Sequence, residues 1–386
     1  MTPRRDVRHR FLALVGALLL GCDVTSPSSG PPLVWDQLDA GSTATCGVTL
    51  DGEGYCWGDA WAAGGSDTSP PVLLPRRLPG HHQWRMIEVG QRIACGLTVA
   101  QETICWGPSW NVYDSEPKQV RGDQHFATIT VGDSHACGLT AAGAAWCWGD
   151  NLRGELGLAW PDYLTAPRDS AVQPVGGQAY VALRAGPEST CGLVANGDLF
   201  CWGGSEVEGD GFTPHVVQTG FGFTALSFGG SGGGRGEACA IGADSTLYCF
   251  GYEVHSLLPQ PTPTAVTLPG GSKPGQAAVG GTWQPLMGLP YAYALHHCGV
   301  STTGVVFCWG SNDYGQLGDS STVDRPIADV VAGLTDVASV TTGGIHSCAL
   351  THDGTAYCWG WNGRGQLGIG SDRDHVTTPM RVLSAP

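Results

Sequence analysis

Cysteine is the residue type with the clearest chemical potential in this sequence. The chain has fifteen cysteines, and fourteen of them form seven pairs whose members are ten positions apart. The pairs are Cys46 and Cys56, Cys95 and Cys105, Cys137 and Cys147, Cys191 and Cys201, Cys239 and Cys249, Cys298 and Cys308, and Cys348 and Cys358. This pattern predicts seven disulfides, which form in oxidising compartments. Zinc ligands follow other spacings, and reduced cysteines packed as small apolar side chains are the alternative.

The separation of ten positions has a geometric cause. If paired cysteines face each other across an antiparallel hairpin, the hairpin closes with a three-residue loop, whose third residue favours glycine. Five of the seven loops have glycine at that place: Gly52, Gly143, Gly197, Gly304 and Gly354. Gln101 and Ser245 are the exceptions. We therefore expect one disulfide-clamped hairpin per repeat, each bond stabilising the fold by roughly 2–3 kcal/mol.

Histidine also recurs at one repeat position, two residues before a cysteine. His135, His296 and His346 occupy this position, and Glu237 stands there in the fifth repeat. Equivalent residues of a ring of repeats lie on one circle, so a shared metal site is one interpretation. The alternative, which we favour, is that each histidine bonds the backbone within its own repeat.

Other candidate sites lack the context that their chemistry needs. Ser231 lies in a Gly-x-Ser-x-Gly pattern, but a nucleophilic serine requires a strand–turn–helix elbow that a glycine-rich loop does not provide. The acidic stretches Asp319–Asp324 and Asp372–Asp374 lack the ligand order of a calcium loop, and we interpret them as solvated turns. No phosphate-binding loop or dinucleotide fingerprint is present. The sequence thus predicts no catalytic residue, no metal ligand and no cofactor.

The N-terminus has the features of an export signal. Four arginines lie within Met1–Arg10, and the apolar run Phe11–Leu20 follows. Ten helical residues rise about 15 Å, half of a roughly 30 Å hydrocarbon core, so residues 1–21 are predicted to be a signal peptide rather than a membrane span. No other apolar run is long enough to cross a bilayer.

Leu19-Leu-Gly-Cys22 resembles the bacterial lipobox. That resemblance implies cleavage before Cys22 and attachment of a diacylglycerol to its sulfur; a stray cysteine in an ordinary signal peptide is the alternative. Residues 23–32 are small, polar or proline, as in a flexible tether. We expect residues 22–32 to hold the folded part at most about 35 Å from the membrane.

Composition and spacing both predict an all-β repeat fold. The 386 residues include 60 Gly and 25 Pro, which is typical of turn-rich β-proteins. Seven cysteine pairs recur about every 50 residues, a period in the propeller range. An aromatic residue and glycine follow the second cysteine of every pair: Trp57, Trp106, Trp148, Trp202, Phe250, Trp309 and Trp359. We expect these rings to pack between sheets rather than to form a binding cage.

The last repeat carries a family resemblance. Residues 343–368, from Gly-Gly-Ile-His346 to Gly-Gln-Leu-Gly368, resemble a repeat of the regulator of chromosome condensation (RCC1) family. Residues 311–318 and 151–157 match the same Asn…Gly-Gln/Glu-Leu-Gly loop, which the other four repeats lack. The resemblance implies a seven-bladed β-propeller of four-stranded sheets over residues 33–386, each blade having a strand that ends in glycine and a strand led by proline.

A ring of blades has to close. The chain begins with a strand ending in glycine, Val34–Gly41, and finishes with a strand led by proline, Pro379–Leu383. We predict that Pro379–Leu383 pairs beside the N-terminal strand.

Net charge limits the possible partners. The formal charge is −15, and lysine occurs only at Lys118 and Lys273. Nucleic acid binding needs a basic patch, so this class of partner is excluded. The glycine-rich or acidic stretches at 205–211, 229–236 and 270–275 are expected to be inserted loops, where individual function resides.

The combined prediction is a monomeric, non-enzymatic scaffold in the bacterial cell envelope. The scaffold is extracytoplasmic, touches the membrane only through the lipid on Cys22, and binds a protein. One alternative is an envelope hydrolase acting at a propeller face, which a convergent cluster of carboxylates or histidines at one mouth of the central shaft would favour. The second is a passive structural envelope protein.

Overall fold

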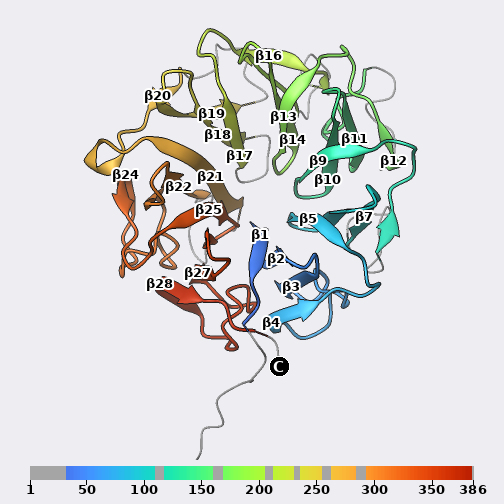
Figure 1. Cartoon of the computed structure of the whole chain (residues 1–386). Coiled ribbons are helices and arrows are strands. Elements are labelled where there is room, and N and C mark those ends of the chain that lie inside the picture. The colour runs from blue at the N-terminus through green and yellow to red at the C-terminus, as the bar shows by residue number, and fades with distance from the viewer. Residues whose placement is uncertain are drawn as a thin grey trace, which may run out of the picture.

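The computed structural model describes residues 32–108, 117–159, 168–204, 212–229, 235–253, 262–283 and 293–384. Within these residues there is no α-helix, and seven four-stranded antiparallel sheets surround a central axis (Figure 1). The prediction of an all-β, seven-bladed propeller is confirmed. Among the described residues, none forms a helix capable of spanning a bilayer. Cys22, Ser231 and the whole stretch 205–211 lie outside the described residues.

Every blade is built from four consecutive strands. Blades 1 and 2 comprise β1 (Trp35–Ala40), β2 (Ala44–Thr49), β3 (Gly54–Gly58) and β4 (Val72–Arg77), then β5 (Trp84–Val89), β6 (Ala94–Thr98), β7 (Thr103–Trp106) and β8 (Lys118–Gln119). Blades 3 and 4 comprise β9 (Phe126–Val131), β10 (His135–Thr140), β11 (Ala145–Gly149) and β12 (Arg168–Val172), then β13 (Tyr180–Ala185), β14 (Ser189–Val194), β15 (Leu199–Gly203) and β16 (His215–Gln218).

Blades 5 and 6 comprise β17 (Ala225–Gly229), β18 (Arg235–Ile241), β19 (Leu247–Glu253) and β20 (Thr264–Ala265), then β21 (Pro274–Trp283), β22 (Tyr293–Ser301), β23 (Val306–Gly310) and β24 (Arg325–Val330). Blade 7 comprises β25 (Val337–Thr342), β26 (His346–Thr351), β27 (Ala356–Trp361) and β28 (His375–Arg381). The strand that precedes the recurring glycine is innermost in each blade, and the strand predicted to be led by proline is outermost.

The clamped hairpin lies at the centre of every blade. The second and third strands pair so that the two cysteines stand directly opposite each other, as Cys46 does to Cys56. All seven pairs lie at disulfide distance, with Cα–Cα separations of 4.0–4.2 Å. Gly52 ends its three-residue loop with φ of 81°, and the exceptional Gln101 and Ser245 adopt the same left-handed conformation at 66° and 63°. The hairpin geometry therefore holds even where glycine is absent.

The aromatic rings that follow the second cysteine of each pair fill the spaces between blades, as predicted. Trp359 of blade 7 packs against Val300 and Val306 of blade 6, and Trp202 of blade 4 packs against Leu139 of blade 3. Five of the seven rings have almost no exposed surface: Trp57, Trp106, Trp148, Trp202 and Trp359. Each ring thus seals a blade to its predecessor.

Ring closure differs from the prediction. Pro379–Leu383 does not pair beside the N-terminal strand, because Met380 and Arg381 pair with Cys358 and Tyr357 of their own blade. The chain starts with an innermost strand and ends with an outermost one, so no strand is left to exchange. Blade 1 instead lies directly beside blade 7 (Figure 1). One hydrogen bond, from the backbone N of Leu33 to Oγ of Ser384 at 3.1 Å, joins the two ends.

The inserted loop predicted at 270–275 is partly regular structure. It contains the end of a short 3-10 helix, η3 (Pro269–Gly271), and the start of β21. β21 is longer than the other innermost strands, because its pairing with β22 continues past Gly280 to Trp283 opposite Tyr293. Part of the extra length of the sixth repeat is therefore a longer β-ladder.

Candidate functional site

The seven innermost strands enclose a central channel of about 830 Å³. Each of these strands leads into a glycine at the same level of the channel: Gly41, Gly90, Gly132, Gly186, Gly229, Gly280 and Gly343. At five of the seven blade contacts, the glycine lies against the carbonyl oxygen of the next blade's glycine. A Cβ on Gly90 would lie 1.7 Å from the carbonyl oxygen of Gly132, and one on Gly343 would lie 2.1 Å from that of Gly41. Glycine is thus required by the close approach of backbones at this level.

Two positions before the glycine, each strand places a residue in the channel lining. The seven are Asp39, Glu88, Thr130, Arg184, Ser227, Ala278 and Thr341. Several of them accept a hydrogen bond from the backbone of the next blade: Asp39 from the N–H of Val89 at 2.7 Å, and Ser227 from that of Val279 at 3.0 Å. The same side chains therefore line the channel and join the blades.

The charged members of this level lie on blades 1, 2 and 4. Burial raises the pKa of Asp39 to about 6, against hydrogen bonds from Val89 and Thr341 that lower it. Burial also raises the pKa of Glu88 to about 8; the nearby carboxylate of Asp39 adds to this shift, and the Arg184 guanidinium opposes it. One side of the channel is therefore acidic and partly protonated at neutral pH.

A second group of carboxyls lies at one mouth of the channel. Asp133 and Glu188 follow the glycines of blades 3 and 4 and line this mouth. Burial, with a further contribution from Glu188, raises the pKa of Asp133 to about 7. Glu155, buried nearby in the loop of blade 3, has its pKa raised to about 8, mainly by burial. Carboxyls that hold a proton near neutral pH have the capacity for acid–base chemistry.

The three repeat histidines do not form a metal site. Each lies fully buried at a different blade contact, and its Nε2 bonds a hydroxyl of the next blade: His135 to Thr190 at 2.9 Å, for example. The predicted backbone bond within the same blade was therefore wrong, although the structural role was right. Burial lowers the pKa of each imidazole to about 3, so all three are neutral. Across the described residues, no group of three or more His, Cys, Asp or Glu side chains is arranged to hold a metal ion.

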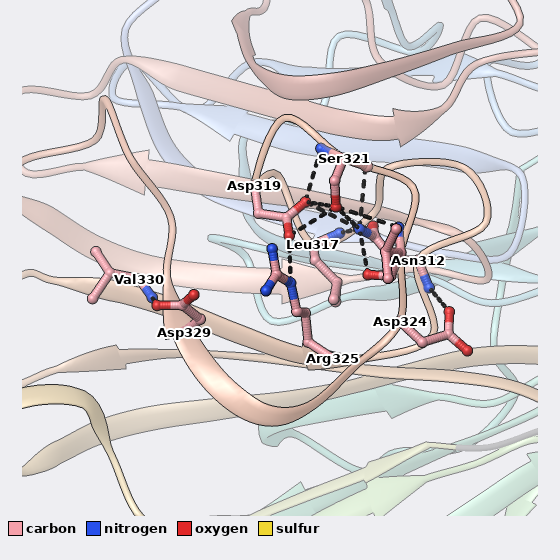
Figure 2. Close-up of polar contacts among 9 residues, drawn as sticks. Asn312, Leu317, Asp319, Ser321, Asp324, Arg325, Asp329 and Val330 are labelled. Atoms are coloured by element: carbon pink, nitrogen blue, oxygen red, sulfur yellow. Dashed lines mark hydrogen bonds and ion pairs between the residues drawn. The ribbon is translucent and has the colours of Figure 1, made fainter.

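The acidic stretch 319–324 is an internally bonded loop rather than a freely solvated turn. The Asp319 carboxylate accepts hydrogen bonds from Ser321, from the amide of Asn312 and from Arg325 (Figure 2). These donors together lower the pKa of Asp319 against the effect of its burial. Asn312 also accepts the backbone N–H of Leu317 at 3.0 Å. The Asp319 carboxylate therefore holds the loop of blade 6 in shape through hydrogen bonds from residues of that loop and from Arg325.

The two faces of the propeller differ in how their connections vary. One face, here named the hairpin face, carries the seven uniform loops between second and third strands and the six connections between blades, which are six to eight residues long. At the opposite face, named the loop face, first and third strands end and second and fourth strands begin. The connections from third to fourth strands span residues 59–71, 107–117, 150–167, 204–214, 254–263, 311–324 and 362–374. The Asp133 and Glu188 mouth opens on this variable face.

Sequence reasoning did not identify the hydroxyl partners of the histidines or the charged channel. Thr45, Thr190 and Ser347 each stand directly before the first cysteine of their repeat, in the blade that follows a histidine-bearing one. Reading each repeat against the next, rather than alone, would have found this signal. The channel carboxyls Asp39 and Glu88 have no carboxyl counterpart at the equivalent position of the other repeats. No repeat pattern therefore marks them, and only the fold brings them together.

Comparison with known proteins agrees with this architecture. Models of the regulator of chromosome condensation (RCC1) repeat match residues 303–350 and 353–386, and a second RCC1 repeat model matches 126–155 and 337–366. No curated protein sequence matches the chain.

Among solved structures, human WBSCR16 has a TM-score of 0.67 at 20% identity, covering 86% of this chain and 93% of that one. The ectodomain of the Physcomitrella patens receptor kinase CR4 has a TM-score of 0.52 at 19% identity, over 85% and 74% of the two chains. The ectodomain of the Arabidopsis thaliana receptor kinase ACR4 has a TM-score of 0.51 at 18% identity, over 88% and 93%. At these identities the likeness shows the fold, and the matched segments show that this chain contains repeats of the RCC1 family within a seven-bladed β-propeller.

Proposed function

We propose that this chain is a non-enzymatic scaffold, anchored outside the cytoplasm by a lipid on Cys22, that binds a protein partner on its loop face. The observation that carries the proposal is the contrast between the two faces. Seven uniform, clamped hairpins make one face rigid, and connections of differing length and sequence emerge on the other. Variable loops on a rigid framework are the usual place for binding residues.

An oxidising location is supported by the cysteine pairs at disulfide distance, because such bonds are rare where thiols are kept reduced. The lipobox-like segment ending at Cys22 supports anchoring. Replacing Cys22 with Ser is expected to release the protein from membranes into the soluble fraction. Unchanged membrane association of Cys22→Ser would contradict the anchor while leaving the binding proposal untouched.

Face-specific variants test the binding proposal. Leu152 and Val323 are 50% and 65% exposed in connections of the loop face, and Leu50 and Val99 are 68% and 65% exposed in the loops of the hairpin face. Residues 33–386 and the two double variants, each carrying Asp in place of one apolar pair, would serve as bait in native envelope extract. The loop-face variant is expected to lose at least about tenfold in captured partner, which corresponds to about 1.4 kcal/mol. Equal loss by the hairpin-face variant would contradict the assignment of the face.

The carboxyls at the channel mouth favour one alternative, an envelope hydrolase. Asp133 is a half-protonated acid near neutral pH beside the second carboxyl of Glu188. This alternative predicts that the protein hydrolyses an envelope polysaccharide or peptide. Asp133→Asn is expected to abolish this activity, whereas Asp123→Asn, at an exposed site, is expected to leave it unchanged. If the folded propeller neither captures a partner nor hydrolyses a substrate, the remaining hypothesis is a passive structural protein.

A further inference from the structure

Consecutive blades meet through one recurring pair of positions. The first is two residues before the first cysteine of a blade, and the second is one residue before the first cysteine of the next blade. We name these two residues a seam pair. Three seam pairs join imidazole Nε2 to a hydroxyl: His135 to Thr190 at 2.9 Å, His296 to Ser347 at 3.0 Å, and His346 to Thr45 at 2.9 Å. The last of these closes the ring between blades 7 and 1.

The direction of donation in these pairs is fixed by a third group. Oγ1 of Thr45 donates its one hydrogen to the backbone carbonyl of Gln366, at 2.8 Å. The Thr45 hydroxyl must therefore accept a hydrogen bond from His346, whose Nε2 is protonated and whose Nδ1 is not. Thr190 and Ser347 donate to the equivalent carbonyls of Glu155 and Gln316. In this type of seam pair, the earlier blade donates and the later blade accepts.

Other seam pairs are apolar on both sides. Blades 1 and 2 match Ala44 with Ala94, all buried in one cluster, and blades 2 and 3 match Ile93 with Ala136 in another. Neither of these contacts leaves a buried hydrogen-bonding side chain facing an apolar one. At six of the seven blade contacts the chemistry of one residue matches that of its partner, about 50 residues away in the chain. The contact between blades 4 and 5 is the exception, because buried Ser189 is paired with Ala238 there.

The contact between blades 5 and 6 reverses the polar pair. Glu237 stands at the histidine position and His297 at the hydroxyl position, with Oε2 and Nε2 3.2 Å apart. His297 is 5% exposed and stacks on Trp309 with a ring-centroid distance of 4.8 Å. Here the later blade supplies the imidazole and the earlier blade the carboxylate, whose side chain is 22% exposed.

We infer that Glu237 and His297 form an inverted seam pair, which specifies that blade 6 and no other blade packs on blade 5. Each residue suits its present partner better than a second residue of its own kind. A histidine in place of Glu237 would face the imidazole of His297, and a glutamate in place of His297 would face the carboxylate of Glu237. A blade of similar shape in either place would remove the 3.2 Å contact between the Glu237 carboxylate and the buried His297 imidazole. Repeats with similar clamped hairpins are thereby kept in order around the ring.

A reciprocal exchange tests the inference in residues 33–386. Glu237→His alone and His297→Glu alone are each expected to lower the thermal midpoint by about 5 °C or more, since a kcal/mol shifts it by about 2–4 °C in chains of 150–250 residues. The double exchange is expected to recover to within about 2 °C of the parent. An additive loss in the double variant would show that the two residues do not act as a pair.

A second cycle keeps the test decisive if the exchanged chains fail to fold. Glu237→Ala with His297→Ala reproduces the Ala44–Ala94 type of pair, and it is expected to lose less than the sum of the two single alanine variants. Additive alanine losses would overturn the inference. The exposed pair Asp336 and His352, 3.1 Å apart with side chains 78% and 62% exposed, is the matched control. Its reciprocal exchange is expected to shift the midpoint by less than about 1 °C, because exposed ion pairs contribute little.

Discussion

At the residue scale, single atoms decide how closely the blades approach. Six of the seven channel glycines lie against the backbone of the next blade, and Gly186 lies against the ring of Phe228, so the ring closes to its observed diameter only without side chains at these positions. This close approach allows two kinds of contact between blades. Channel-lining side chains accept hydrogen bonds from the backbone of the next blade, and the seam pairs join side chains of neighbouring blades. The sequence shows where the glycines are, but only the structure shows that a carbonyl oxygen of the next blade leaves no room for a Cβ at six of them.

Gly90→Ala is expected to prevent assembly of a stable ring or to destabilise it by several kcal/mol. A Cβ there would overlap the carbonyl oxygen of Gly132 at 1.7 Å, and a backbone oxygen moves only if the blades separate. Soluble yield and a urea unfolding curve would measure the effect. Gly251→Ala is the control, because a Cβ at Gly251 has no heavy atom within 4 Å. A fully stable Gly90→Ala protein would contradict the role of the ring of glycines.

At the element scale, the hairpin is the unit that the sequence specifies most strongly. Ten positions between cysteines, a left-handed third loop residue and direct opposition of the two cysteines are all consequences of one antiparallel register. Even Gln101 and Ser245 take the left-handed conformation, because the register leaves the loop no other way to close.

Mass analysis without reduction is expected to show seven internal bridges and no free thiol among the fourteen paired cysteines. Removing one bridge, as in Cys46→Ala with Cys56→Ala, is expected to lower the free energy of unfolding by roughly 2–3 kcal/mol through the unfolded chain. Free thiols at the paired positions would contradict the prediction of disulfide-clamped hairpins. The matched comparison is the same double change at Cys348 and Cys358, in a blade that has the Asn loop.

At the scale of the whole molecule, buried ionisable groups set the dependence of stability on pH. The pKa values of Glu88, Asp133 and Glu155 are raised to about 8, 7 and 8, so the folded chain holds protons that the unfolded chain has released. Their contribution is present below the ordinary carboxyl pKa and is lost as pH rises through the folded values. The buried histidines act in the opposite sense, but only between about pH 3 and their ordinary value of 6.5.

Between pH 6.5 and 8.5 the carboxyls therefore act alone, and we predict that the thermal midpoint falls as pH rises through this window. Glu88→Gln is expected to flatten this dependence, because the amide has no proton to release. The exposed Glu102→Gln is expected to leave it unchanged. A midpoint that rises from pH 6.5 to 8.5 would contradict the protonated state of the channel.

The sequence alone determined the repeat number, the hairpin register and the aromatic seal between blades, because each depends on residues close together in the chain or on a regular period. Closure was mispredicted because it depends on how the first and last repeats meet. Met380 pairs within its own blade, and His346 with Thr45 joins blades 7 and 1.

Only the tertiary structure decided which distant residues share one environment. Asp39, Glu88 and Arg184 come from three repeats and become a charged channel only when their strands are gathered around an axis. The partner of each histidine likewise lies in the following blade, outside any local pattern. Local periodicity specifies the blade, whereas contacts across about 50 residues specify the ring, since each of them requires two repeats to be read together.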